Sequence, residues 1–434
     1  MKKLSLSILL LSCIPCFSQD AAMFRGNPRH TGLYQSSPLT KPGTVKWKFA
    51  THGMVMSSPA VVDGVAYFGS DDHNLYAVNV DTGVLKWKFA TKSRVTSSPA
   101  VANGMVYFGS FDGNFYGVDA ASGQQKWTFR TAGEHRFTAQ HLHGLQPATE
   151  SMPDPFDFYL SSPAVVGNAV YFGSGDGNVY ALDASAGTLN WKFHTGDVVH
   201  GSPAVADGVV FVGSWDSYFY ALDAANGTER WRLKTGEDPD THNQVGIQSS
   251  PVIADGVVYF GCRDSNLYAV NAQTGQKKWA FSNKGSWVIA SPVVKNGKVY
   301  FATSDSGLFR ALDAGTGAEL FSLDFKHWPM FSSPAIAGDM LYIGSHTGKL
   351  IAVNLKSQAV AWTFETEASK KNGAMFMKND GTPNYEAVFA DDFYDEIVVG
   401  MTKMLGVGAI LSSPVIVNGV IYFGSTDGNL YALQ

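Results

Sequence analysis

The segment YFGSTDGNLYALQ, residues 422–434, ends the chain and is one of several close copies. YFGSDDHNLYAVN begins at Tyr67, YFGSFDGNFYGVD at Tyr107 and YFGSGDGNVYALD at Tyr171. In each earlier copy the chain continues to a segment resembling KWKF, whereas the last copy stops before one. The copies predict a repeat protein whose final repeat is completed by another part of the chain.

Each repeat opens with Ser-Ser-Pro or a variant of it. The first strand is an apolar stretch, and a two-residue turn such as Asp63-Gly64 follows it. The second strand resembles VYFGS and leads through an xDGN turn to a third strand that resembles LYALDA. A TG turn then leads to a fourth strand, which carries Trp. Asp-Gly and Asn-Gly pairs supply the positive φ angles of tight hairpins. Each repeat therefore predicts four short antiparallel strands. The eight prolines are Pro59, Pro99, Pro163, Pro203, Pro251, Pro292, Pro334 and Pro414.

A four-stranded unit that recurs about every 40 residues is typical of a β-propeller. One blade cannot bury both faces of its sheet, so the blades must close into a ring. The fourth-strand aromatic residue Trp47 precedes the first Ser-Ser-Pro, and the repeat that starts at Ser412 lacks a fourth strand. We therefore predict an all-β fold, an eight-bladed β-propeller of four-stranded antiparallel blades, with residues 44–50 closing the last blade. Deletion of residues 44–50 is expected to destabilise the whole ring.

The first residues resemble an export signal. Lys2 and Lys3 precede an apolar run, and small residues flank a cut after Ser18. This predicts a signal peptide at 1–18, a lead-in at 19–43 and the propeller at 44–434, in an exported protein that is periplasmic or secreted. A second interpretation is a lipoprotein signal that anchors the protein through an acylated Cys13. No transmembrane segment is expected after signal removal, and a net charge of −5 without a basic run argues against nucleic-acid partners.

Three connections between a fourth strand and the next first strand are long, at about 131–159, 235–247 and 365–410. Connections of this type leave one face of a propeller, so we expect the insertions to lie together, where loops on a rigid ring usually bind partners. In the third insertion Phe389, Phe393, Ile397, Met401 and Met404 predict one apolar stripe of a helix. That helix either caps the ring or docks a partner. HLHG at 141–144 lacks a third ligand at a diagnostic spacing, so no metal site is predicted.

The repeat provides an internal control: residues that every blade shares are explained by blade structure, and departures need another reason. The xDGN aspartates are shared by seven blades and are interpreted as turn caps. The residues that differ from the repeat pattern concentrate in blades four to six. Their aromatic, guanidinium and amide groups predict a patch that binds a planar or sugar-like ligand with an acid group. The alternative is that these residues anchor the insertions. The predicted ligand-binding residues are His200, Trp215, Gln248, Arg263, Trp287, Arg310 and His327.

The pattern SPAVxDGxVYFGSxDGNLYALDAxTGxxxW resembles the repeat of the pyrroloquinoline-quinone (PQQ)-like propellers, and MFRGNPRHTGLY from Met23 resembles the lead-in of exported members. The family includes quinoprotein dehydrogenases and a non-catalytic lipoprotein of the outer-membrane β-barrel assembly machine. The resemblance implies the fold, but function varies across such folds.

We expect first an exported non-catalytic binding or scaffold protein, with a small-molecule, sugar-like or protein partner on the face with the long loops. The first alternative is a PQQ-dependent oxidoreductase of alcohols or sugars, which would need PQQ and calcium. The second is a polysaccharide-processing enzyme. The adjacent Cys-Cys pair common in the quinoproteins is missing, and no residue is singled out as catalytic.

Overall fold

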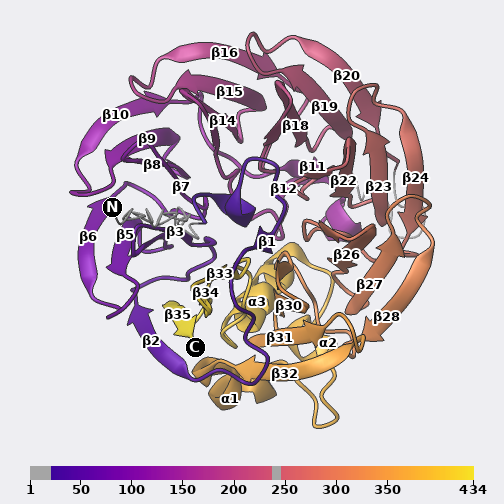
Figure 1. Ribbon diagram of the computed structural model, residues 1–434. Helices are drawn as coiled ribbons and strands as arrows, with labels where there is room; N and C mark the ends of the chain where they lie inside the picture. The colour runs from indigo at the N-terminus through magenta and orange to yellow at the C-terminus, as the bar shows by residue number, and fades with distance from the viewer. Residues whose placement is uncertain (1–20, 237–245) are drawn as a thin grey trace, which may run out of the picture.

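The computed structural model describes residues 21–236 and 246–434. Eight sheets stand around a central axis as the blades of a propeller (Figure 1). Neighbouring strands within each blade are antiparallel and are joined in chain order, which confirms the predicted all-β fold. The proposed signal peptide and Cys13 lie outside the described residues. Among the described helices, none is long and apolar enough to cross a membrane.

The first four blades contain strands of three, five or six residues. Their strands are β3 (Ala60–Val62), β4 (Val65–Gly69), β5 (Asn74–Asn79) and β6 (Leu85–Ala90); β7 (Ala100–Ala102), β8 (Met105–Ser110), β9 (Asn114–Asp119) and β10 (Gln125–Arg130); β13 (Ala164–Val166), β14 (Ala169–Gly173), β15 (Asn178–Asp183) and β16 (Leu189–His194); and β17 (Ala204–Ala206), β18 (Val209–Gly213), β19 (Tyr218–Asp223) and β20 (Glu229–Lys234).

The last four blades follow the same plan. Their strands are β21 (Val252–Ala254), β22 (Val257–Gly261), β23 (Asn266–Asn271) and β24 (Lys277–Ser282); β25 (Val293–Lys295), β26 (Lys298–Ala302), β27 (Leu308–Asp313) and β28 (Glu319–Asp324); β29 (Ala335–Ala337), β30 (Met340–Gly344), β31 (Lys349–Asn354) and β32 (Ala359–Glu365); and β33 (Val415–Val417), β34 (Val420–Gly424) and β35 (Asn429–Leu433), which β2 (Val45–Ala50) completes.

Closure of the ring follows the sequence prediction. β2 pairs antiparallel with β35, with Trp47 opposite Ala432 and Lys48 opposite Tyr431. Thr44 and Gln434 exchange both backbone hydrogen bonds, at 2.9 and 3.0 Å. The N-terminal strand and the C-terminal strand thus share blade eight.

The fourth-strand tryptophans join each blade to the next. The indole nitrogen of Trp87 donates to Ala120 O in blade two, and the ring lies so close to Gly123 that a Cβ there would meet it at 2.6 Å. Glycine at this turn therefore permits the close approach as well as the positive φ of 71°. The chain ends after β35 of blade eight, so that blade has no turn to accept this bond from blade seven. Trp362 of blade seven donates instead to Leu39 O of the lead-in. The same indole bonds run from Trp47, Trp127, Trp191, Trp231 and Trp279 to a carbonyl of the following blade.

A ring of serines holds the blades together at the axis. The second serine of each Ser-Ser-Pro motif, or the serine of its variant, accepts a backbone N–H from the preceding blade, and the circle closes where Ser413 N donates to Ser58 Oγ at 2.8 Å. The lead-in crosses the centre of the ring in Figure 1. There β1 (Leu33–Tyr34) pairs parallel with β29, and the buried Arg25 in the 3-10 helix η1 (Phe24–Gly26) donates to the carbonyls of Pro292 and Pro334. The eight serines, in ring order, are Ser58, Ser98, Ser162, Ser202, Ser250, Ser291, Ser333 and Ser413.

The first and third insertions form one structure, which we call the crown (residues 131–159 and 365–410). Gln146 N donates to Asp392 O at 2.9 Å, and Tyr394 Oη donates to Pro153 O at 2.8 Å. Most of the second insertion, 237–245, lies outside the described residues. The crown contains β11 (Thr138–Gln140), η2 (Leu142–Gly144), β12 (Ser151–Pro153), α1 (Glu367–Asn372), η3 (Gly373–Met375), α2 (Tyr385–Val388) and α3 (Tyr394–Leu405).

The predicted helix exists, but its stripe is shorter than expected. In α3 Met401 and Met404 are buried, in a core cluster with Met56, Phe331 and Leu411 at the inner ends of three blades. Phe389 follows α2 instead, and Phe393 is the exposed residue before the first turn of α3. The helix therefore caps the ring through its C-terminal half. The prediction was wrong for the two phenylalanines because the chain bends between α2 and α3.

Candidate functional site

The turn aspartates have the structural role that the repeat predicted, with one exception. In six blades the carboxylate accepts a hydrogen bond of 2.5–2.7 Å from the tyrosine four residues later, and it also binds backbone N–H groups of its turn. Blade six has Asp305 but Phe309 in the tyrosine position, so this bond cannot form. The six pairs are Asp72–Tyr76, Asp112–Tyr116, Asp176–Tyr180, Asp216–Tyr220, Asp264–Tyr268 and Asp427–Tyr431.

Arg263 lies at the centre of the predicted patch, between two tryptophans. Its guanidinium carbon is 4.3 Å from the ring centre of Trp215 and 4.4 Å from that of Trp287. Nη1 donates to Asp154 Oδ2 at 2.7 Å, and both Nε and Nη2 donate to Gln248 Oε1. Arg263 is 1% exposed, so this is a buried charge-assisted contact with an acid of the first insertion.

The other partners of this arginine also belong to the first insertion. Asp154 accepts a second contact from His143 Nε2 at 3.0 Å, and Gln248 Nε2 donates to Phe156 O. Burial alone would raise the pKa of Asp154, but Arg263 and His143 hold it well below its usual range. Trp215 stacks on Phe137 with ring centres 4.6 Å apart.

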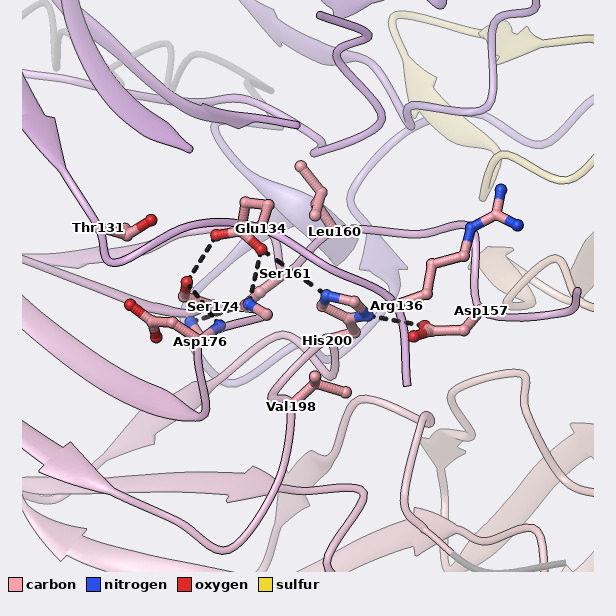
Figure 2. A network of polar contacts seen from close by, with 12 residues as sticks. Thr131, Glu134, Arg136, Asp157, Leu160, Ser161, Ser174, Asp176, Val198 and His200 are labelled. Atoms are coloured by element: carbon pink, nitrogen blue, oxygen red, sulfur yellow. Dashed lines mark hydrogen bonds and ion pairs between the residues drawn. The ribbon is translucent and has the colours of Figure 1, made fainter. Parts of the chain in front are cut away.

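A second buried network centres on His200 (Figure 2). Its Nδ1 is 2.7 Å from Asp157 Oδ1, while Nε2 is 3.7 Å from Glu134 Oε2, which is an ion-pair distance rather than a hydrogen bond. Glu134 also accepts from Ser174 Oγ and Gly175 N, both at 2.6 Å. A Cβ on Gly175 would lie 2.6 Å from the backbone of His135, so glycine is needed for the insertion to lie this close.

The charge state of His200 predicts a pH dependence of stability. Burial would lower the pKa of His200, but the charges of Asp157 and Glu134 outweigh burial and raise it to about 10. Because this exceeds the unfolded value of about 6.5, the contribution of the imidazolium is complete below pH about 6.5 and is lost as pH rises towards 10. We expect the denaturation midpoint to fall between pH 6.5 and 9 in the wild type and to fall less in His200→Gln. His135→Gln, which changes an exposed histidine of the same insertion, is the control; equal pH slopes in all three proteins would contradict the assignment.

The structure brings together five of the seven predicted ligand-binding residues. His200, Trp215, Gln248, Arg263 and Trp287 are all buried against the first insertion, which favours the anchoring interpretation for their visible contacts. Direct ligand binding by them stays a prediction.

The other two predicted residues lie apart from these five. Arg310, on β27, pairs with Glu319 on β28 and lies over Phe281 of blade five, away from the crown. His327 is exposed, and its backbone carbonyl accepts a hydrogen bond from Tyr385 Oη at 3.3 Å.

In the described structure a small space of about 50 Å³ beside the ring of serines is lined in part by His200 and Gln248, and two larger cavities lie at the crown. One of about 280 Å³ lies where α2 and α3 meet blades six and seven, and it is lined by Asp305, His346 and aromatic side chains. The other, of about 180 Å³, is lined by Met401 and Leu405 of α3 and includes Asp71, Arg94 and Arg136. Among the described residues no group of three or more His, Cys, Asp or Glu is arranged to hold a metal ion.

A closed ring of eight four-stranded repeats, joined by tryptophans and covered on one face by insertions, defines the class of PQQ-like propellers. The family model described as outer membrane protein assembly factor BamB matches residues 39–151, 149–364 and 280–434. The chain belongs to this family. No curated protein sequence matches it.

Solved structures with this fold include a BamB protein and two dehydrogenases. BamB from Moraxella catarrhalis is 16% identical, with a TM-score of 0.65 over 90% of this chain and 99% of its own. A europium-containing methanol dehydrogenase is 14% identical, with a TM-score of 0.68 over 96% and 98%. The quinohemoprotein alcohol dehydrogenase from Comamonas testosteroni is 14% identical, with a TM-score of 0.67 over 96% and 80%. At these identities the similarity establishes the fold alone.

Proposed function

We propose that this protein is an exported, non-catalytic binding protein of the PQQ-like propeller family, with its ligand or partner site on the crown. One observation carries the proposal. Two charged side chains on this face that could take part in catalysis are bound to the protein's own insertion, Arg263 to Asp154 and His200 to Asp157. A cavity of about 280 Å³ is present where α2 and α3 meet blades six and seven. Such a volume suits a small organic molecule.

The site at the two tryptophans does not fit a planar quinone. A flat cofactor would need the space between Trp215 and Trp287, and the guanidinium of Arg263 fills that space at 4.3 and 4.4 Å from the two rings. Moving Arg263 out would leave Asp154, which is fully buried, without its principal counter-charge. This disfavours the PQQ-dependent oxidoreductase, and no contact specifically supports a polysaccharide-processing enzyme.

The proposed location outside the cytoplasm rests on the export-like first residues and on membership of a family described as an outer membrane protein assembly factor. A protein partner on the crown would be consistent with that description. We favour a small-molecule site because the space beside α2 and α3 is a cavity of about 280 Å³ whose lining includes the buried side chains of Phe331, His346 and Met404.

A reconstitution experiment tests the non-catalytic role. The purified protein is incubated with calcium and PQQ and desalted, and then its visible absorbance, melting temperature and dye reduction with alcohols and sugars are measured. We expect no retained quinone absorbance, an unchanged melting temperature and no dye reduction, because a ligand that bound the folded state would raise the melting temperature. Dye reduction that depends on added PQQ would overturn the proposal. Native mass spectrometry of the same preparation detects any ligand that co-purifies.

A further inference from the structure

The 280 Å³ cavity has aromatic walls and one carboxylate. Phe156 comes from the first insertion, Phe331 from the connection into blade seven, and Tyr385 and Phe389 from the region of α2. Tyr385 and Phe389 are half-buried, so the cavity lies near the surface of the crown. Asp305, in the turn between β26 and β27, supplies the carboxylate.

The repeat explains why Asp305 is available. All seven turn aspartates lie within the described residues, and six of them bind a tyrosine four residues later, as described above. Asp305 has Phe309 there, and its carboxylate accepts instead from the neighbouring Ser304 Oγ at 2.6 Å. It is also the one exposed member of the seven, and it lines the cavity.

The negative charge of Asp305 has no close counter-ion. No ion pair to Asp305 occurs within the described parts of the chain, and no Lys or Arg lines the cavity. Arg263 acts on Asp305 electrostatically, but its guanidinium is bound to Asp154. Desolvation by the surrounding protein raises the pKa of Asp305 and outweighs the opposing effects of Ser304 and Arg263.

The histidine that lines the cavity is buried and neutral. His346 is 1% exposed, neither ring nitrogen has a hydrogen-bond partner among the described residues, and burial lowers its pKa to about 3. Its ring packs against Phe331, with centres 4.3 Å apart. Because the imidazole carries no charge at neutral pH, it does not neutralise Asp305.

We propose that this cavity binds a small organic ammonium ion, with the positive charge against Asp305 and the alkyl groups against the rings of Phe156, Phe331, Tyr385 and Phe389. Aromatic faces attract cations through their quadrupole, and the attraction is strongest where water is excluded. A carboxylate adds a charge-assisted contact and selects against uncharged molecules of the same shape. This inference rests on the proposed binding function and names the ligand class of that site.

The test uses choline as the charged probe and, as its neutral counterpart, the alcohol in which carbon replaces the quaternary nitrogen. Binding of each to the full-length mature protein is measured by isothermal titration calorimetry. We expect saturable binding of choline and at least about tenfold weaker binding of the neutral isostere. Absence of saturable choline binding, or equal affinity for the two probes, would overturn the proposal.

Variants separate the role of the site from loss of folding. Asp305→Asn keeps an acceptor for Ser304 and removes the charge, and it should weaken choline binding at least about tenfold with an unchanged melting temperature. Phe389→Leu keeps apolar volume and removes one ring, and it should weaken binding less. Asp392→Asn removes an exposed carboxylate from the same insertion and should leave binding unchanged. Equal affinity of wild type and Asp305→Asn would exclude Asp305 as the recognition group.

Failure of this inference and failure of the proposed function give different results. If choline does not bind and added PQQ supports no dye reduction, the ligand class is wrong and the binding role stands. If added PQQ supports dye reduction, the non-catalytic role is wrong, whatever choline does.

Discussion

Replacing β2 (Val45–Ala50) with a glycine–serine segment of equal length should destabilise all eight blades together. The replacement removes the edge strand of blade eight and Trp47, whose indole nitrogen donates to Val80 O at 2.7 Å in blade one. Loss of a buried tryptophan typically costs about 3–5 kcal/mol, and the exposed edge of β35 adds to this. In the other seven blades the chain itself connects the third strand to the fourth, whereas β35 and β2 are held together in blade eight by contacts alone, so we expect a larger loss than from an internal tryptophan. Thermal unfolding followed by circular dichroism measures the effect.

Two controls isolate closure from loss of a single side chain. Trp191→Ala removes the equivalent indole bond, to Ala224 O, at an internal junction and should lower the melting temperature less. A synthetic peptide with the sequence of residues 41–51 should raise the melting temperature of the replacement variant by mass action, and the same peptide with Trp47→Ala should not. Equal melting temperatures for the variant and the wild type would show that closure contributes nothing.

The ring of blades could be predicted because the sequence pattern that forms each blade is repeated along the chain. Eight copies of one pattern reveal the strands. The strand that carries Trp47 stands before the first repeat, and the repeat that begins at Ser412 lacks a fourth strand, so the two ends of the chain were expected to pair, as β2 and β35 do. The repeat also favoured turn capping for the aspartates, which is confirmed in six blades by the backbone N–H that donates to the carboxylate from two residues further on.

The crown was harder to predict because it has no second copy for comparison. Asp154 and Asp157 stand in an insertion where nothing in the sequence distinguishes them from surface acids, and Asp154 reaches Arg263 across 109 positions. Asp305 was hidden for the opposite reason: the aspartate itself matches the repeat, and only the missing tyrosine at Phe309 sets it apart. Comparison of residue pairs, rather than single positions, would have found it.

Replacing Arg263 should be among the most damaging single substitutions in the protein. Removal of one member of a buried ion pair typically costs about 3–5 kcal/mol, because the other charge is left without compensation. Arg263→Ala leaves Asp154 fully buried beside the His143 imidazole, leaves Gln248 Oε1 without its two donors, and opens the space between Trp215 and Trp287. We expect a large fall in the denaturation midpoint and earlier proteolysis within residues 131–159 than in the blades.

A double substitution decides between the two interpretations of this residue. Arg263→Met with Asp154→Leu removes both charges while retaining apolar bulk, and it should recover much of the stability lost in Arg263→Ala, since apolar pairs often replace buried ion pairs without loss. Recovery would mean that Arg263 anchors the insertion. If Arg263→Ala instead melts like the wild type, the arginine is not needed to hold the crown, and its place between two tryptophans would have to be explained by a ligand that displaces it.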